Sequence, residues 1–176
     1  MKDIRHGEVV EISGPVERSG EILTAPATGR ACVVVRSFLV LESHVAWNYR
    51  VDVLRDERAV DFYLRAGRDR VLVRAAGTDL HMSGIEESGV TGKPEGRLRE
   101  LLRQQETAFD GSGLLQVRWR ERVVCEGDHA TVRGRASIEV DPEPGASRAG
   151  YREEPMRIVL AGTLEIGVGR HAGRAL

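Results

Sequence analysis

The chain has 176 residues, a length that suits one domain, and its 41% hydrophobic and 30% charged residues describe an ordinary globular protein. Its formal net charge of −1 gives no overall attraction to nucleic acid or anionic lipid. No stretch reaches the roughly 18 apolar residues of a membrane-spanning helix, and charged residues interrupt the N-terminus where a signal peptide would be apolar. We therefore expect a cytoplasmic protein, or one associated with a membrane on its reducing side through segments absent from this chain.

The basic residues and cysteines narrow the chemistry. Of 26 basic residues only Lys2 and Lys93 are lysine, and coding bias explains this more simply than selection for anion binding. Cys32 and Cys125 are too few for a disulfide framework or a cysteine-rich zinc site. Both lie in apolar runs, so we interpret them as buried thiols, with a single bridge between them as the alternative. The five histidines are scattered, and we expect neither a metal nor a cofactor.

Taken in chain order, short apolar stretches separated by turn residues predict an antiparallel β protein. Strands are expected at 7–12, 21–24, 31–41, 45–53, 60–64, 71–73 and 158–168, with turns at 13–15 and 55–58. Residues 83–96 hold four glycines and no periodic pattern, which predicts a mobile loop. One helix is expected near residues 95–109, where apolar residues recur at helical spacing. The predicted fold class is mainly β: a partly closed antiparallel barrel or sandwich with one covering α-helix.

Residues 115–140 predict one long β-hairpin. Alternation places a set of apolar residues on one face of the first arm: Leu115, Val117, Trp119, Val123 and Cys125. On the second arm the corresponding residues are Ala130, Val132, Ala136, Ile138 and Val140. Gly127-Asp128 suits a two-residue turn between the arms. That turn would place Arg122 opposite Arg133, and Arg120 opposite Arg135.

The exposed face of this hairpin is a candidate anion-binding surface. It would carry five arginines: Arg118, Arg120, Arg122, Arg133 and Arg135. Like charges directly opposite cost up to about 1 kcal/mol, so something negative must relieve them. A phosphate, a lipid headgroup or an acidic segment could do so. The alternative, which we favour, is carboxylates of the protein itself, for instance Asp141, Glu143, Glu153 and Glu154. Nucleic acid is not expected, because this face has no aromatic side chain on which bases could stack.

Glu121 breaks the apolar pattern of its strand and is predicted to point inward, opposite Gly134. A buried carboxylate must be paired or hydrogen-bonded. It could be a catalytic acid or base, or a structural acceptor for backbone amides or an arginine. We favour the structural role, because the sequence places no second carboxylate or nucleophile beside it.

Four stretches, residues 7–12, 23–35, 60–64 and 121–134, together resemble the GIDE domain. This is the non-RING domain of mitochondrial membrane-anchored E3 ubiquitin ligases and of bacterial relatives. It likewise has a Pro/Gly turn before a Cys-containing strand, a Phe-x-Leu strand and a late Glu…Gly-Asp…Gly motif. The resemblance implies a single GIDE-like β domain over residues 1–176, with a core at about 7–168 and a frayed tail at 169–176.

The resemblance implies a binding or sensing domain close to a membrane, without chemistry of its own. Two cysteines cannot form a RING, so no ubiquitin-ligase activity is expected. The partner would be a protein or an anionic ligand. The alternative is a small hydrolase-like enzyme using Glu121. A second acid, a histidine or a hydroxyl in a cleft with Glu121 would favour the enzyme, and a hydrogen-bonded Glu121 without a cleft would favour the binding domain.

Overall fold

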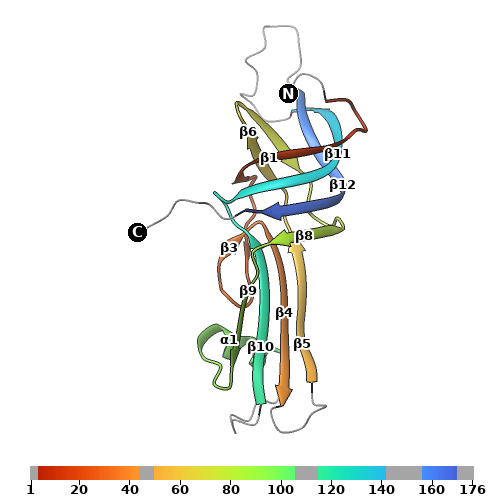
Figure 1. The fold of residues 1–176 in the computed structure, drawn as a ribbon. Helices are drawn as coiled ribbons and strands as arrows, with labels where there is room; N and C mark the ends of the chain where they lie inside the picture. The colour runs from red at the N-terminus through yellow and green to blue at the C-terminus, as the bar shows by residue number, and fades with distance from the viewer. Residues whose placement is uncertain (1–3, 44–49, 106–114, 142–155, 170–176) are drawn as a thin grey trace. The chain divides into compact units, whose positions relative to one another are not determined.

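The computed structural model describes residues 4–43, 50–105, 115–141 and 156–169, and the protein is mainly β, as predicted (Figure 1). The described residues form twelve strands and one helix. They group into two compact units. The barrel unit comprises residues 1–21, 60–84 and 126–176, and the sheet unit comprises 22–59 and 85–125. A compact unit need not fold alone, so the single GIDE-like domain stays a prediction; most of the predicted tail, 170–176, lies outside the described residues.

The barrel unit is a closed barrel of five strands, not a partly closed one. These strands are β1 (Val9–Arg18), β6 (Phe62–Ala66), β7 (Asp69–Val73), β11 (His129–Val140) and β12 (Met156–Val168). Their order is β11-β1-β6-β7-β12, and a β11–β12 pairing closes the ring. Because β11 returns to lie beside β1, the first four have the spatial order of a Greek key. A five-stranded Greek-key barrel is the architecture of the OB-fold. A sixth strand, β8 (Leu80–Gly84), pairs parallel with β12.

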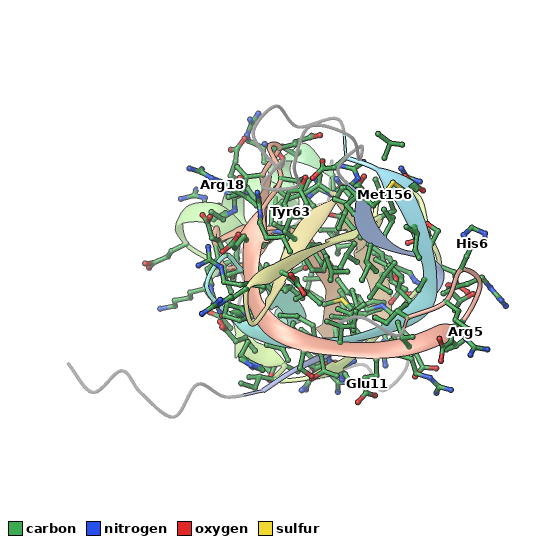
Figure 2. All side chains as sticks on the ribbon, turned by 90° about the horizontal axis from the view of Figure 1, so that it is seen from above. Arg5, His6, Glu11, Arg18, Tyr63 and Met156 are labelled. Atoms are coloured by element: carbon green, nitrogen blue, oxygen red, sulfur yellow. The ribbon has the colours of Figure 1, made fainter. Side chains whose placement is uncertain are left out.

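Side chains that alternate inward along these strands form the barrel core. Fully buried members include Val16, Phe62, Leu64, Val71, Val132, Leu160 and Leu164. A register shift at Gly134 lets β12 bend, so that it pairs with both β7 and β8. Gly134 also leaves the space that Leu164 fills, since a Cβ there would lie 2.6 Å from Leu164 Cδ2. Figure 2 shows β1 curving around the barrel in pale red, with Glu11 pointing outward.

The turn expected at residues 13–15 is wrong, because β1 runs through this stretch without interruption. Gly14 serves close approach of two strands instead of a turn. A Cβ on Gly14 would lie 2.1 Å from the backbone oxygen of Arg65 on β6. Glycine and proline thus occur here inside a strand, where glycine permits a close approach of two backbones, and not only in turns.

The sheet unit contains a four-stranded sheet in the order β5-β4-β10-β9 and a small β2–β3 pair (Figure 1). Its elements are β2 (Leu23–Thr24), β3 (Ala31–Cys32), β4 (Val34–Ser43), β5 (Arg50–Ala59), β9 (Glu87–Thr91), α1 (Gly96–Gln104) and β10 (Leu115–Val124). Helix α1 packs on one face of the sheet, with Leu98, Leu101 and Leu102 against Leu39, Leu41 and Val117. The single predicted helix is confirmed over residues 96–104, and its expected last turn lies outside the described residues.

Two expected interruptions are strands in the structure. Residues 55–58 lie inside β5 instead of a turn, and β9 runs through the stretch expected to be a loop. In β9, Gly89 pairs with Trp119 of β10, and a Cβ on Gly89 would lie 2.6 Å from the indole nitrogen. The glycine therefore makes room for the tryptophan ring.

The central hairpin prediction is wrong. β10 pairs with β4 and β9, whereas β11 pairs with β1 and β12. The expected turn is present, with Gly127 at φ +86°, but its backbone bonds to β1: Gly127 N donates to Val16 O, and Val16 N donates to Asp128 O. The chain thus leaves one sheet and enters another at this turn. Alternation reports which face a side chain occupies, and it contains no information about the partner strand.

This change of partners alters two further expectations. Glu121 lies opposite Ser37 and Glu87, and not opposite Gly134, which is in the barrel. At the end of β11, Ile138 and Val140 are 41% and 51% exposed, so they are not core residues.

Candidate functional site

Three of the five predicted arginines lie together on one face of the sheet unit. Arg118, Arg120 and Arg122 alternate along β10 with Val117, which faces α1. Successive side chains of a strand point to opposite faces, so the three guanidiniums lie on the face away from the helix. This face is the candidate site.

A row of four residues crosses this face in strand register. Arg120 lies opposite Ser88 on β9 and opposite Phe38 on β4, and Phe38 lies opposite Arg55 on β5. Directly opposite residues share a face of the sheet. We call Ser88, Arg120, Phe38 and Arg55 the Arg–Phe row. Phe38 is half-buried, while Arg55 and Arg120 are exposed.

The rows on either side are neutralised by the protein's own acids. Arg118 Nη2 lies 2.7 Å from Glu42, whose carboxylate raises the pKa of this guanidinium through hydrogen bonds and charge. Arg122 Nη2 lies 3.2 Å from Glu86. Arg36 on β4 lies 2.8 Å from Glu57.

The Arg–Phe row itself is much less neutralised. Arg120 lies 3.9 Å from Glu86, a carboxylate that is closer to Arg122, and the Arg120 side chain is 60% exposed. The guanidinium carbon of Arg55 lies 5.6 Å from the centre of the Phe38 ring. Within the described parts of the chain, no carboxylate is paired with Arg55. The row therefore combines two weakly compensated cations with a partly exposed aromatic ring.

The other two predicted arginines are not part of this face, so the five-arginine surface is wrong as a geometry. Arg133 and Arg135 lie on β11 of the barrel unit. Arg133 Nη1 is 3.5 Å from Glu165, and Arg135 Nη1 donates to Gly7 O at 2.6 Å. None of the described acids that pair with the five arginines is among those named from the sequence; Glu143, Glu153 and Glu154 lie outside the described residues. The anion-binding role itself stays a prediction.

Glu121 is buried, with 1% of the residue exposed, and both carboxylate oxygens accept hydrogen bonds. Ala27 N donates to Oε1 at 2.9 Å, and Thr28 donates to Oε2 through its backbone N at 3.0 Å and its Oγ1 at 2.5 Å. These donors belong to the Pro/Gly turn between β2 and β3. Glu121 therefore holds that turn against the sheet, which is what a structural acceptor does.

The hydroxyl group directly opposite Glu121 belongs to Ser37 of β4. Ser37, directly opposite, is also buried, and its Oγ makes no hydrogen bond with the described residues. A nucleophilic serine needs a base within hydrogen-bond reach, and no such bond joins Ser37 to Glu121. Arg97 Nε donates to Pro26 O at 2.7 Å and so fixes the same turn from α1. The arrangement stabilises a loop and leaves the carboxylate no unused oxygen.

The cysteines are both free thiols, but only Cys32 is buried. Burial, followed by the charges of Cys125 and Glu121, raises the pKa of the Cys32 thiol to about 12. Cys125 is half-buried, so its interpretation as a buried thiol is wrong. It packs against the small apolar cluster that contains Cys32, and Arg30 Nη2 lies 3.3 Å from its Sγ.

The barrel unit has a second candidate surface, because OB-type barrels bind ligands on the face of their second and third strands. Here these strands are β6 and β7. Tyr63 is only 6% exposed, and the guanidinium carbon of Arg70 lies 3.9 Å from its ring centre. Arg65 and Arg70 both pair with Glu17 of β1. Both cations are thus engaged, and the ring is covered.

A further ion pair on the barrel has a clear electrostatic effect. Arg74, directly after β7, donates two hydrogen bonds to Glu139 of β11, at 2.8 and 2.6 Å. These bonds are the main reason that the pKa of the Glu139 carboxyl lies below its ordinary value; burial acts in the opposite direction, and the positive charge of Arg74 lowers the pKa further. Ser137 adds a weaker bond at 3.2 Å.

The described residues contain no group of three or more His, Cys, Asp or Glu side chains placed to hold a metal ion. In the same part of the chain, no helix has the length and apolar character needed to cross a bilayer. No family model, curated protein or solved structure matches this sequence. The resemblance to the GIDE domain therefore stays a prediction.

Proposed function

We propose that this protein is a non-catalytic binding domain for an anionic partner, close to a membrane as the resemblance to the GIDE domain implies. The observation that carries the proposal is the exposed sheet face of the sheet unit, with three arginines of β10 and the weakly compensated Arg–Phe row. Guanidinium groups on a rigid sheet are suited to phosphates and carboxylates.

The state of Glu121 supports a binding function over the hydrolase-like alternative. A general acid or base must reach the substrate with a free oxygen. Glu121 gives both oxygens to the turn at residues 27–28 and is almost completely buried. Its position is explained by the stability of the turn alone.

The test compares two double variants with the same change in charge. R55Q/R120Q removes the two weakly compensated cations of the sheet face, and R133Q/R135Q removes two cations of the barrel. Wild-type protein should bind immobilised polyphosphate or vesicles containing phosphatidylglycerol at low salt, and less at higher salt because exposed charges are screened. R55Q/R120Q should lose most of this binding, and R133Q/R135Q should retain it.

Two results would contradict the proposal. One is the absence of binding to any anionic probe by wild-type protein at low salt. The other is an equal loss in both double variants, which would reflect total charge instead of a site. Urea unfolding of each variant shows whether a loss of binding comes from a loss of folding.

A further inference from the structure

We infer that the Arg–Phe row binds a single-stranded nucleic acid, with a base stacked at Phe38 and phosphates held by Arg55 and Arg120. This inference rests on the proposed function and names the class of anion. It also differs from the expectation drawn from the sequence, which excluded nucleic acid because the arginine face lacked an aromatic residue. That premise is wrong, since the strand beside β10 is β4, and β4 places Phe38 next to Arg120.

The spacing within the row suits one phosphate chain with bases. Adjacent strands lie about 4.8 Å apart, so Arg120 and Arg55 lie one strand on either side of Phe38. A nucleotide strand crossing β10, β4 and β5 would meet a cation, a ring and a second cation in sequence. Sequence-independent recognition of single strands uses this combination of a positive track and an aromatic platform.

In the free protein, the guanidinium group of Arg55 lies over one face of the Phe38 ring. Arg55 lies over it at 5.6 Å, a distance within the range of a cation–π contact. Bases stack both on aromatic rings and on the planar guanidinium of arginine. The Phe38–Arg55 pair can therefore offer a stacking surface either as a ring or as a ring with its arginine.

The distribution of charge argues for a narrow ligand. The neighbouring arginines Arg36, Arg118 and Arg122 are paired with carboxylates at 2.8, 2.7 and 3.2 Å, so the weakly compensated charge is confined to a single line across the sheet. A lipid surface is attracted by clustered basic residues over a broad area. A single phosphate chain needs only a line. Because the net charge of the protein is −1, binding must depend on this local track.

The experiment measures fluorescence anisotropy of a labelled oligothymidine of about 12 nucleotides, a length within the site sizes of single-strand binding domains. Inorganic polyphosphate serves as an anion without bases. F38L keeps an apolar side chain but removes the ring, and it should weaken oligonucleotide binding by about fivefold or more. The same variant should leave polyphosphate binding unchanged.

The salt dependence tests the phosphate contacts separately. Loss of two phosphate contacts in R55Q/R120Q should lower the slope of log affinity against log salt concentration by about 1.4 for a single strand. R133Q/R135Q should leave this slope unchanged. When F38L is added to R133Q/R135Q, it should weaken oligonucleotide binding as much as it does in wild-type protein.

The outcomes separate this inference from the proposed function. If F38L and wild-type protein bind oligothymidine equally well, or if phosphatidylglycerol vesicles bind more tightly than the oligonucleotide, the inference is wrong while anion binding stands. If wild-type protein binds none of the three anions, both fail. An unchanged urea midpoint for F38L shows that any loss comes from the missing ring.

Discussion

The role of Glu121 yields the sharpest prediction about stability. Its carboxylate accepts three hydrogen bonds from the turn at residues 27–28, at 2.9, 3.0 and 2.5 Å. Replacement by glutamine keeps one oxygen, which can stay with Thr28. The new amide group then points its own N–H toward Ala27 N–H, so one accepted bond becomes a contact between two donors. Since a bond to a charged group contributes about 1.5–3 kcal/mol, E121Q should cost about 2–3 kcal/mol.

Alanine at the same position removes all three acceptors and leaves a gap. The bonds are partly buried, so water can replace some of them, and we expect E121A to cost about 3–5 kcal/mol. A domain of this size has only about 5–15 kcal/mol of stability, so the effect should move the urea midpoint clearly. Tryptophan fluorescence is a suitable probe, because Trp119 lies on β10, the same strand as Glu121.

The matched control is E87Q, the same chemical change on the strand next to Glu121. The Glu87 side chain is 42% exposed and pairs with Arg30 at the surface, so its loss should cost less than about 1 kcal/mol. An E121Q effect no larger than that of E87Q would refute the structural role. A gain in stability on E121Q would also support the catalytic alternative, because active sites keep groups that lower the stability of the fold.

In native protein at pH 8 a thiol probe should label Cys125 first and Cys32 very slowly, because burial and a pKa of about 12 leave Cys32 almost no thiolate. Mass spectrometry of protein labelled after unfolding should show two labels. Fast labelling of both cysteines in native protein would contradict this prediction. G14A should destabilise the barrel by about 3 kcal/mol or more, because the added Cβ meets backbone at 2.1 Å, whereas G20A, with nothing within 4 Å, should change the thermal midpoint little. The pKa of Glu139 is lowered in the folded state, so its contribution to folding stability is present above the ordinary pKa of 4.5 and is lost as the pH falls through the lowered pKa. The difference in unfolding free energy between wild type and E139Q should therefore shrink in acid. A difference that does not vary with pH would contradict this prediction.

The sequence predicted the fold class and the facing of side chains well. Alternation correctly placed Val117 and Val132 in apolar cores, and helical spacing correctly located α1. It also indicated that Glu121 points inward, and this residue is buried. Each of these conclusions depends on local periodicity, which the burial of one face imposes on the chain.

The partners of the strands could not be predicted from the same pattern. Gly127 and Asp128 have the chemistry of a hairpin turn, and the structure uses them in a turn that bonds to β1. A hairpin would pair the arginines of β10 with those of β11, whereas the actual partner strand β4 places Phe38 opposite Arg120, and β5 places Arg55 opposite Phe38. Arg36, Phe38 and Val40 are alternate residues of β4 and so share one face of it, but this spacing contains no information that β10 lies alongside.

The four points at which the chain passes between the units, after residues 21, 59, 84 and 125, determine how the protein can be dissected. Replacing 22–59 and 85–125 with short linkers would leave every barrel strand in one continuous polypeptide. Removing the barrel residues instead would leave the sheet unit as two separate peptides. One insertion contains β4 and β5, and the other contains β9, α1 and β10. As separate peptides these would have to meet by diffusion, whereas the barrel strands tether them at high effective concentration. The sheet unit is therefore built from two separate insertions, residues 22–59 and 85–125, and the barrel strands between them are their only covalent connection.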